Sequence, residues 1–246
     1  NKVSSMTFTN THLGYAEIQK TTNTGKNLGG WKFDIFQDAA CTQAVEGSPY
    51  TTNDAGKMSV CLRAGTYYVR EVDESTSKPD WVFDSTVHEV TVMAGETASV
   101  ILENLQMGKI KLVKLMPDGG SLSGWGFDIY RKSDNAHIGT YTTDEKGTIL
   151  SEWLIPGEYL VYEQPDENGR YWCDSQNPRQ VVLRAGKTAS VYFTNRLKPG
   201  KIAIQKVDFT GEPLGGAEFL LEWSVDGKAW QPVSYTDSDY VAQGGC

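Results

Sequence analysis

The chain has 246 residues and a formal net charge of −8, and 39% of its residues are hydrophobic while 22% are charged. This composition is typical of soluble globular proteins, and the length is enough for more than one hydrophobic core. The acidic balance and the lack of any basic run argue against binding to nucleic acid or to anionic membrane surfaces. No apolar run reaches the roughly 18 residues of a membrane-spanning helix, so the sequence predicts no such segment.

A repeat of about 93 residues organises the chain. Each unit opens with a glycine that starts a strand-like segment, and a lysine follows six residues later. An apolar strand, a glycine-containing turn and a strand of the form Gly-x-Tyr-x-Val-x-Glu come next, and a last apolar strand ends in asparagine. In chain order the matching segments are 14–20, 108–114 and 200–206; 28–36, 122–130 and 214–219; 52–56 and 143–147; 64–71 and 156–163; 90–100 and 181–191; and 6–10, 100–104 and 191–195.

The repeated segments predict an all-β fold. Nearly every segment is a short strand followed by a Gly or Asp turn, and no long segment has the 3.6-residue period of a helix. Regularly spaced short strands predict one β-sandwich per unit. We expect residues 1–12 to be the last strand of a preceding repeat, 13–107 and 108–199 to be complete domains, and 200–246 to be the N-terminal part of a further domain. Short linkers between the units favour an extended, rather stiff rod.

Three polar residues in each complete unit are in phase with apolar core positions. Side chains alternate between the two faces of a strand, so residues two apart share a face. A polar group on the core face requires a partner, and the same residue types recur at nearly equal spacing in both units, so we expect them to meet in the core. These residues are the lysines Lys20 and Lys114, the glutamates Glu71 and Glu163, and the asparagines Asn104 and Asn195.

Two ordinary interpretations of these residues compete with a chemical one. The lysine and the glutamate can form a buried salt bridge beside the asparagine, or the lysine can extend its amine to solvent at the end of the sandwich. In the chemical interpretation, burial lowers the pKa of the lysine and raises that of the glutamate. The neutral amine then attacks the asparagine carboxamide, while the protonated glutamate polarises the carbonyl and moves protons. Ammonia leaves, and an amide bond joins the two side chains in a single turnover.

The repeat resembles the Cna B-type (collagen-adhesin B-type) domains of Gram-positive surface adhesins and pilins over nearly the whole chain. The resemblance is carried by an early Gly-x-x-Phe-x-[Ile/Leu]-[Phe/Tyr] segment, the Gly-x-Tyr-x-Val-x-Glu strand and a final Phe-x-Asn, which reads Leu-Glu-Asn at 102–104. It implies a prealbumin-like, reverse-immunoglobulin sandwich. In that fold a glutamate-assisted isopeptide bond joins a lysine of the first strand to an asparagine of the last strand.

Carried over by position, the resemblance implies two isopeptide bonds. Lys20 joins Asn104 with the assistance of Glu71, and Lys114 joins Asn195 with the assistance of Glu163. Two further residues are orphan members of such sets, with partners outside this chain: Asn10 and Lys206.

The function implied by the resemblance is that of a structural stalk segment of a Gram-positive cell-surface adhesin or pilin. The expected location is extracellular, with cell-wall anchoring through a region not in this chain. The expected partners are neighbouring repeats of the same chain, with a host protein or glycan as a further candidate. We expect no enzyme activity on a substrate, no cofactor, no nucleic-acid partner and no membrane insertion of this segment.

Two alternative functions stay open: a ligand-binding module for a host protein or glycan, and an accessory domain of a secreted carbohydrate-active enzyme. An exposed aromatic face would favour the binding module, and its candidate residues are Trp153, Trp172, Trp223 and Trp230. Trp31 and Trp125 occupy matching positions of the repeat, which is more typical of packing.

The cysteines give no metal-site signature, because no Cys-x-x-Cys occurs and no histidine lies at ligand spacing. Cys41 and Cys61 are candidates for a disulfide within one unit, while Cys173 and Cys246 are expected to be free or packed.

The other polar candidates have ordinary explanations. Turn chemistry accounts for Asp54 and Asp144 better than calcium ligation does. The three histidines, His12, His88 and His137, are scattered and have no nucleophile motif around them.

Overall fold

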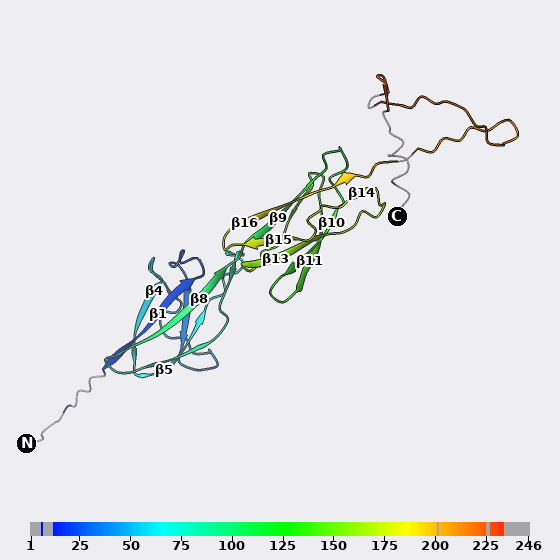
Figure 1. Ribbon diagram of the computed structural model, residues 1–246. Helices are drawn as coiled ribbons and strands as arrows, with labels where there is room; N and C mark the ends of the chain where they lie inside the picture. The colour runs from blue at the N-terminus through cyan, green and yellow to red at the C-terminus, as the bar shows by residue number, and fades with distance from the viewer. Residues whose placement is uncertain (1–5, 7–11, 201, 225–226, 234–246) are drawn as a thin grey trace, which may run out of the picture. The chain divides into compact units, whose positions relative to one another are not determined.

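The computed structural model describes residues 6, 12–200, 202–224 and 227–233. The chain divides into two compact units, Asn1–Lys198 and Pro199–Cys246. All regular elements of the described residues are β-strands, as the repeat predicted, and the first unit contains two sandwiches in succession (Figure 1). No helix in these residues has the length and apolar character needed to cross a membrane.

The first sandwich has two four-stranded sheets, in the orders β4-β1-β8-β6 and β3-β2-β5-β7. Its first strand β1 pairs in parallel with its last strand β8, with Lys20 opposite Leu102 and Thr22 opposite Asn104. The other pairings are antiparallel. The strands are β1 (Leu13–Thr22), β2 (Lys32–Phe36), β3 (Tyr50–Thr51), β4 (Lys57–Arg63), β5 (Gly65–Glu71), β6 (Trp81–Val82), β7 (His88–Val92) and β8 (Thr97–Gln106).

The second sandwich repeats this arrangement with sheets in the orders β12-β9-β16 and β11-β10-β13-β15. Its first strand β9 again pairs in parallel with β16, the last strand of its two larger sheets, and a short pair, β14-β17, is added. The strands are β9 (Lys109–Leu115), β10 (Gly126–Arg131), β11 (Ala136–Thr142), β12 (Thr148–Leu150), β13 (Gly157–Glu163), β14 (Tyr171–Trp172), β15 (Arg179–Leu183), β16 (Thr188–Thr194) and β17 (Arg196–Leu197).

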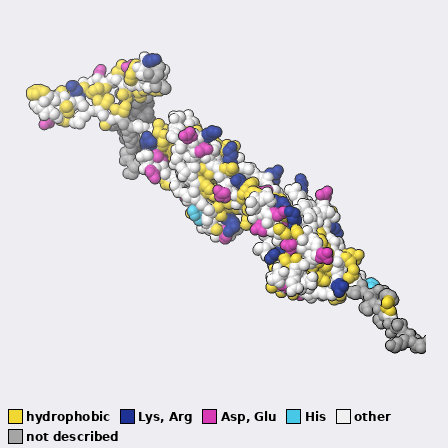
Figure 2. Space-filling view, turned by 180° about the vertical axis from the view of Figure 1, so that it is seen from behind, with side chains coloured by type: hydrophobic (Ala, Val, Ile, Leu, Met, Phe, Trp, Pro, Cys, Tyr) yellow, Lys and Arg dark blue, Asp and Glu magenta, His cyan; other side chains and the backbone are white. Residues whose placement is uncertain are grey.

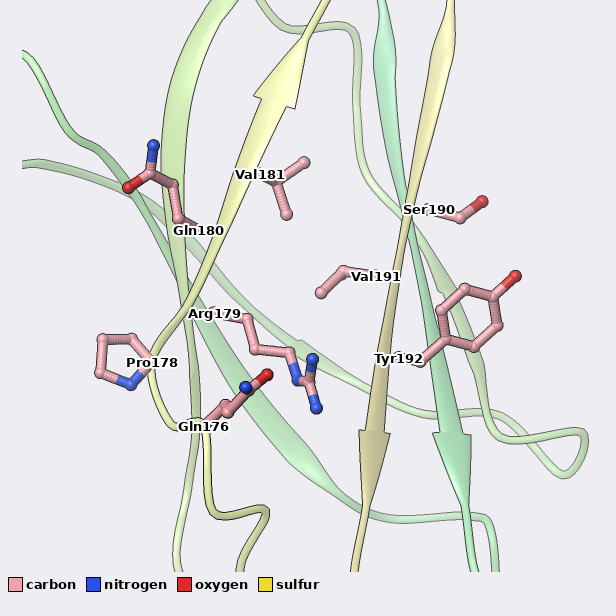
Figure 3. Close-up of a pocket in the computed structure, with 8 residues that line it drawn as sticks. All are labelled: Gln176, Pro178, Arg179, Gln180, Val181, Ser190, Val191 and Tyr192. Atoms are coloured by element: carbon pink, nitrogen blue, oxygen red, sulfur yellow. The ribbon is translucent and has the colours of Figure 1, made fainter.

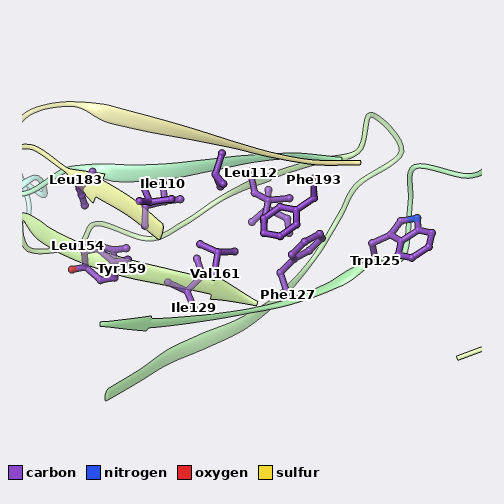
Figure 4. Packing of buried hydrophobic residues seen from close by; sticks show 13 residues of the cluster. Ile110, Leu112, Trp125, Phe127, Ile129, Leu154, Tyr159, Val161, Leu183 and Phe193 are labelled. Carbon is purple, nitrogen blue, oxygen red and sulfur yellow. The ribbon is translucent and has the colours of Figure 1, made fainter. Parts of the chain in front are cut away.

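Each sandwich has its own hydrophobic core between its two sheets. Every second residue of β1 from Gly14 onward is buried, and β9 and β13 alternate in the same way. Figure 4 shows this packing in the second sandwich, where Phe127 and Phe193 approach from opposite sheets with ring centroids 5.0 Å apart. Outside the cores, basic and acidic side chains are interspersed over the face seen in Figure 2.

The C-terminal unit departs from the prediction. The segment 202–206, which was expected to belong to an opening strand, is not a strand, and Ile202, Ile204 and Lys206 are exposed. Among its described residues the unit has one short strand pair, β18 (Glu222–Trp223) with β19 (Gln231–Pro232). An isolated two-stranded pair is marginal in water, and within the described residues no second sheet covers the apolar face that the strand pattern requires. The predicted strand ending at Asn10 lies outside the described residues apart from Met6.

The opening glycine of each sandwich packs against the turn that joins β7 to β8 or β15 to β16. A Cβ on Gly108 would lie 2.5 Å from the Lys187 carbonyl oxygen and 2.9 Å from that of Arg184. A Cβ on Gly14 would clash in the same way with the Met93 carbonyl oxygen. A Cβ on Gly200, which opens the third segment, would meet no atom within 4 Å.

We therefore expect Gly108→Ala to lower the free energy of unfolding of the second sandwich by about 1–3 kcal/mol, because the backbone carbonyls must move. The matched variant Gly200→Ala should stay within about 0.5 kcal/mol of the original chain. Differential scanning calorimetry of both variants measures these changes, and equal effects would contradict the steric explanation.

Candidate functional site

The first predicted set, Lys20, Glu71 and Asn104, is brought together in the core of the first sandwich. Lys20 lies on β1 and Asn104 on the adjacent strand β8, while Glu71 ends β5 in the opposite sheet. Lys20 Nζ lies 3.2 Å from Glu71 Oε1, and Asn104 Nδ2 donates to the same oxygen at 2.7 Å. Lys20 and Asn104 are 0% exposed and Glu71 is 5% exposed. The lysine therefore does not reach solvent, which excludes the snorkelling interpretation.

The second set has the same arrangement. Lys114 lies on β9 opposite Phe193 of β16, and Asn195 follows directly after β16. Lys114 Nζ lies 2.6 Å from Glu163 Oε1, and Asn195 Nδ2 donates to that oxygen at 2.8 Å. All three residues are at most 3% exposed. In both sandwiches one carboxylate oxygen thus contacts the lysine amine and the asparagine amide nitrogen together.

A tryptophan forms one wall of each site. Lys20 Nζ lies 5.0 Å from the ring centroid of Trp31, and Lys114 Nζ lies 4.4 Å from that of Trp125. Both indoles are buried, and each Nε1 donates to a backbone carbonyl, that of Asn27 or Ser121. The rings therefore pack in the core, as their repeat position predicted, and keep water from the lysine amines.

The two sites favour the neutral form of the lysine amine more than a solvent-exposed position does. Burial lowers the pKa of Lys20 and of Lys114, and the nearby glutamate opposes this shift without cancelling it. The Oδ1 atoms of Asn104 and Asn195 are buried and accept no hydrogen bond from the described residues. Each site thus holds an amine with reduced proton affinity beside a carboxamide.

An aspartate contacts each glutamate, and the sequence did not predict either one. The backbone N–H of Asp84 donates to Glu71 Oε2, and that of Asp174 donates to Glu163 Oε2. The carboxylate of Asp84 contacts His88, and that of Asp174 contacts Arg179. The aspartates lie in irregular segments at unequal distances from the glutamates, so the two-residue period of strands gives no signal for them.

The structure does not assemble the candidate aromatic face from the four tryptophans. Trp153 follows β12 and contacts Lys109 at the start of β9, whereas Trp172 pairs with Arg196, which lies beyond the end of β16. These two residues are therefore at opposite ends of the second sandwich. Trp223 and Trp230 are exposed and belong to the C-terminal unit.

The other polar candidates form no metal site or disulfide in the part of the chain that the structure describes. Cys41, Cys61 and Cys173 are free thiols there, so the candidate Cys41–Cys61 disulfide does not form, and Cys246 lies outside that part. No group of three or more potential metal ligands occurs among the described residues.

The turn carboxylates also have a structural role. Asp144 accepts hydrogen bonds from the backbone N–H groups of Lys146 and Thr148. In the first sandwich the corresponding cap is Asn53, which accepts from Ala55 and Lys57, rather than Asp54.

Comparison with known proteins gives a family match over both sandwiches. A family model described as SpaA prealbumin-like fold domain matches residues 14–106 and again 108–197. A search of curated proteins found no match to the sequence.

Solved structures similar to this chain include a Bacillus anthracis protein and two pilins. The Bacillus anthracis TIE protein is 24% identical, with 76% of this chain and 34% of that chain covered and a TM-score of 0.38. A streptococcal ancillary pilin is 16% identical, with 78% of this chain and 64% of that chain covered and a TM-score of 0.38. The shaft pilin SpaA from Lactobacillus rhamnosus GG is 14% identical, with 78% of this chain and 100% of that chain covered and a TM-score of 0.37. The chain thus spans about a third of the first of these proteins and under two thirds of the second.

The lowered lysine pKa predicts a pH dependence of stability in an Asn195→Ala variant, in which Lys114 has no carboxamide to react with. Between the lowered folded-state pKa and the ordinary value of 10.5, the unfolded chain binds one proton more than the folded chain. The free energy of unfolding should therefore rise with pH across this window and be independent of this group below it. Denaturant titrations at several pH values measure the free energy of unfolding of Asn195→Ala and of the control Asn195→Ala/Lys114→Met. If the difference between the two free energies stayed flat or fell with pH, the prediction would be contradicted.

Proposed function

The chain belongs to the SpaA family of prealbumin-like fold domains, and we propose that it is a structural stalk segment of a Gram-positive cell-surface pilin or adhesin. We further propose that each of its two complete domains, 13–107 and 108–199, is closed by an autocatalytic Lys–Asn isopeptide bond. The observation that carries the second proposal is the carboxylate oxygen shared by the lysine and the asparagine in both cores. The segments 1–12 and 200–246 are proposed to belong to neighbouring repeats.

The shared oxygen suits a proton transfer from the nucleophile to the leaving group. The neutral Lys114 amine attacks Cγ of Asn195 through Nζ, and Glu163 Oε1 takes one proton from Nζ as the new bond forms. The bond from Nζ to Cγ forms, and the bond from Cγ to Nδ2 breaks. Glu163 returns the proton to the departing nitrogen, which leaves as ammonia. The same steps apply to Lys20, Glu71 and Asn104.

The fold contributes to the reaction by position and by exclusion of water. The parallel strands hold the lysine and the asparagine on one face of one sheet, and proximity of this kind can lower a barrier by roughly 7–11 kcal/mol. The tryptophan wall and the surrounding core lower the pKa of the lysine by burial. The reaction requires only groups of this chain, and it occurs once in each domain.

The proposed location and partners follow from the family assignment. We place the chain outside the cell, on a protein anchored to the cell wall through another region. Its partners are the neighbouring repeats, and a host protein or glycan is a further candidate. The separation of Trp153 from Trp172 offers no support for a shared aromatic binding face.

Intact-mass spectrometry tests the bonds directly. The purified chain should weigh less than its sequence mass by two ammonia molecules. Lys20→Ala and Lys114→Ala should each restore one ammonia equivalent beyond the mass of the substitution. Lys111→Ala, at an exposed position of the same strand as Lys114, is the control and should retain both losses. A mass equal to that of the sequence would exclude both bonds.

The bond should also stabilise each domain against unfolding. It closes a loop of about 80 residues, which by analogy with disulfides contributes roughly 4–5 kcal/mol relative to the open chain. The double variant Lys114→Met/Glu163→Gln removes the bond without leaving an unpaired buried charge, and it should lose about this amount in the second domain. Calorimetry of the variant resolves the two domains, because the first domain should keep its original transition. An unchanged second transition would argue against the bond.

A further inference from the structure

The glutamate of each site is held by its second oxygen as well as by its first. Glu163 Oε2 accepts the Asp174 backbone N–H at 3.3 Å, and Glu71 Oε2 accepts the Asp84 backbone N–H at 2.9 Å. If the carboxylate rotated, Oε1 would no longer face both the lysine and the asparagine. The orientation of the glutamate therefore depends on where the aspartate backbone is held.

In the second sandwich Asp174 is fixed by contacts with two strands. Arg179 Nη2 lies 3.0 Å from both carboxylate oxygens of Asp174, and the backbone N–H of Thr194 donates to Oδ2 at 2.8 Å. Thr194 directly precedes Asn195, so Asp174 connects the glutamate to the strand that carries the reacting amide. Asp174 itself is 7% exposed.

Arg179 reaches this position through an open groove between β15 and β16. The groove has a volume of about 550 Å³, and Figure 3 shows the Arg179 side chain extending from β15 toward β16 beside Val191. Its guanidinium carbon lies 5.6 Å from the ring centroid of Phe193. The arginine thus closes the edge of the core next to the site.

The first sandwich has a different residue in the same place. His88 pairs with Val69, as Arg179 pairs with Val161, so the two positions are equivalent in the register. His88 Nε2 lies 2.7 Å from Asp84 Oδ2, and the Thr86 backbone N–H donates to Oδ1 at 2.9 Å. The His88 imidazole thus contacts one carboxylate oxygen of Asp84, whereas the Arg179 guanidinium contacts both carboxylate oxygens of Asp174.

We propose that Asp174–Arg179 and Asp84–His88 are positioning pairs for the cross-linking reaction. Each pair holds the backbone N–H that fixes the glutamate carboxylate between the reacting nitrogens. The inference rests on the proposed function and adds residues that touch neither reacting atom. A charge-assisted contact from the arginine or histidine rigidifies the aspartate, and through it the segment before the last two strands.

The rate of bond formation in each domain tests this role. Chain isolated without bonds from inclusion bodies is refolded by dilution, quenched in acid at intervals and digested, and the two cross-linked peptides are quantified by mass spectrometry. Arg179→Ala should slow formation of the Lys114–Asn195 bond about tenfold or more and leave the Lys20–Asn104 bond unchanged in the same molecules. His88→Ala should produce the reverse pattern.

Conservative variants separate positioning from stability. Arg179→Lys keeps the charge but loses the two-oxygen contact, so its rate should lie between those of the original chain and Arg179→Ala. Arg184→Ala replaces an exposed arginine directly after β15 and should leave both rates unchanged. Circular dichroism confirms folding before each rate is compared. If Arg179→Ala does not fold, Arg179→Lys and Asp174→Asn decide the matter.

The experiments distinguish a failure of the positioning role from a failure of the proposed isopeptide bonds. Folded positioning variants that close both bonds at the original rate would overturn this inference while leaving the proposed bonds intact. An original chain that loses no ammonia would overturn the proposed function as well.

Discussion

The parallel pairing of the first and last strands is the constraint on which each sandwich depends. It brings together a lysine from the beginning of the domain's sequence and an asparagine from its end, on one face of one sheet and over the core. The opposite sheet then needs only one residue, a glutamate at the end of β5 or β13, to reach both. The apolar packing that desolvates the lysine would also exclude water from the proposed cross-linking reaction, so the same packing serves stability and the proposed chemistry.

The two sandwiches reach the same arrangement with different surroundings. In the first, the Trp31 ring beside Lys20 meets the rings of Trp81 and Phe83 edge to face. In the second, the Trp125 ring beside Lys114 meets the ring of Tyr171 edge to face. An aspartate lies beside each glutamate, but its side-chain partner differs: His88 contacts Asp84, and Arg179 contacts Asp174. The glutamate that contacts the lysine and asparagine nitrogens is thus repeated closely, while the residues that contact the neighbouring tryptophan and aspartate differ between the two sandwiches.

The sequence predicted correctly which polar residues meet in the core where side chains follow the two-residue alternation of a β-strand. The in-phase positions of Lys20, Glu71 and Asn104 were enough to predict that they meet, because burial of a polar residue on a core face requires a partner. The sequence could not identify Asp84 or Asp174, since an irregular segment places their backbone N–H groups. It also predicted an opening strand over 200–206, but the described residues 202–206 form no strand. A strand pattern marks an apolar face but does not supply the sheet that must cover it.

The register of β1 and β8 has a mechanical consequence. Two parallel neighbours carry the chain into the sandwich at one end and out at the other, so tension along the chain loads their hydrogen bonds in shear. With a bond from Lys20 to Asn104, the load path would run along β1, cross between the side chains and leave through the end of β8. Everything between these two residues would lie off the path. Loops in that stretch could then lengthen or change without weakening the domain as a tether.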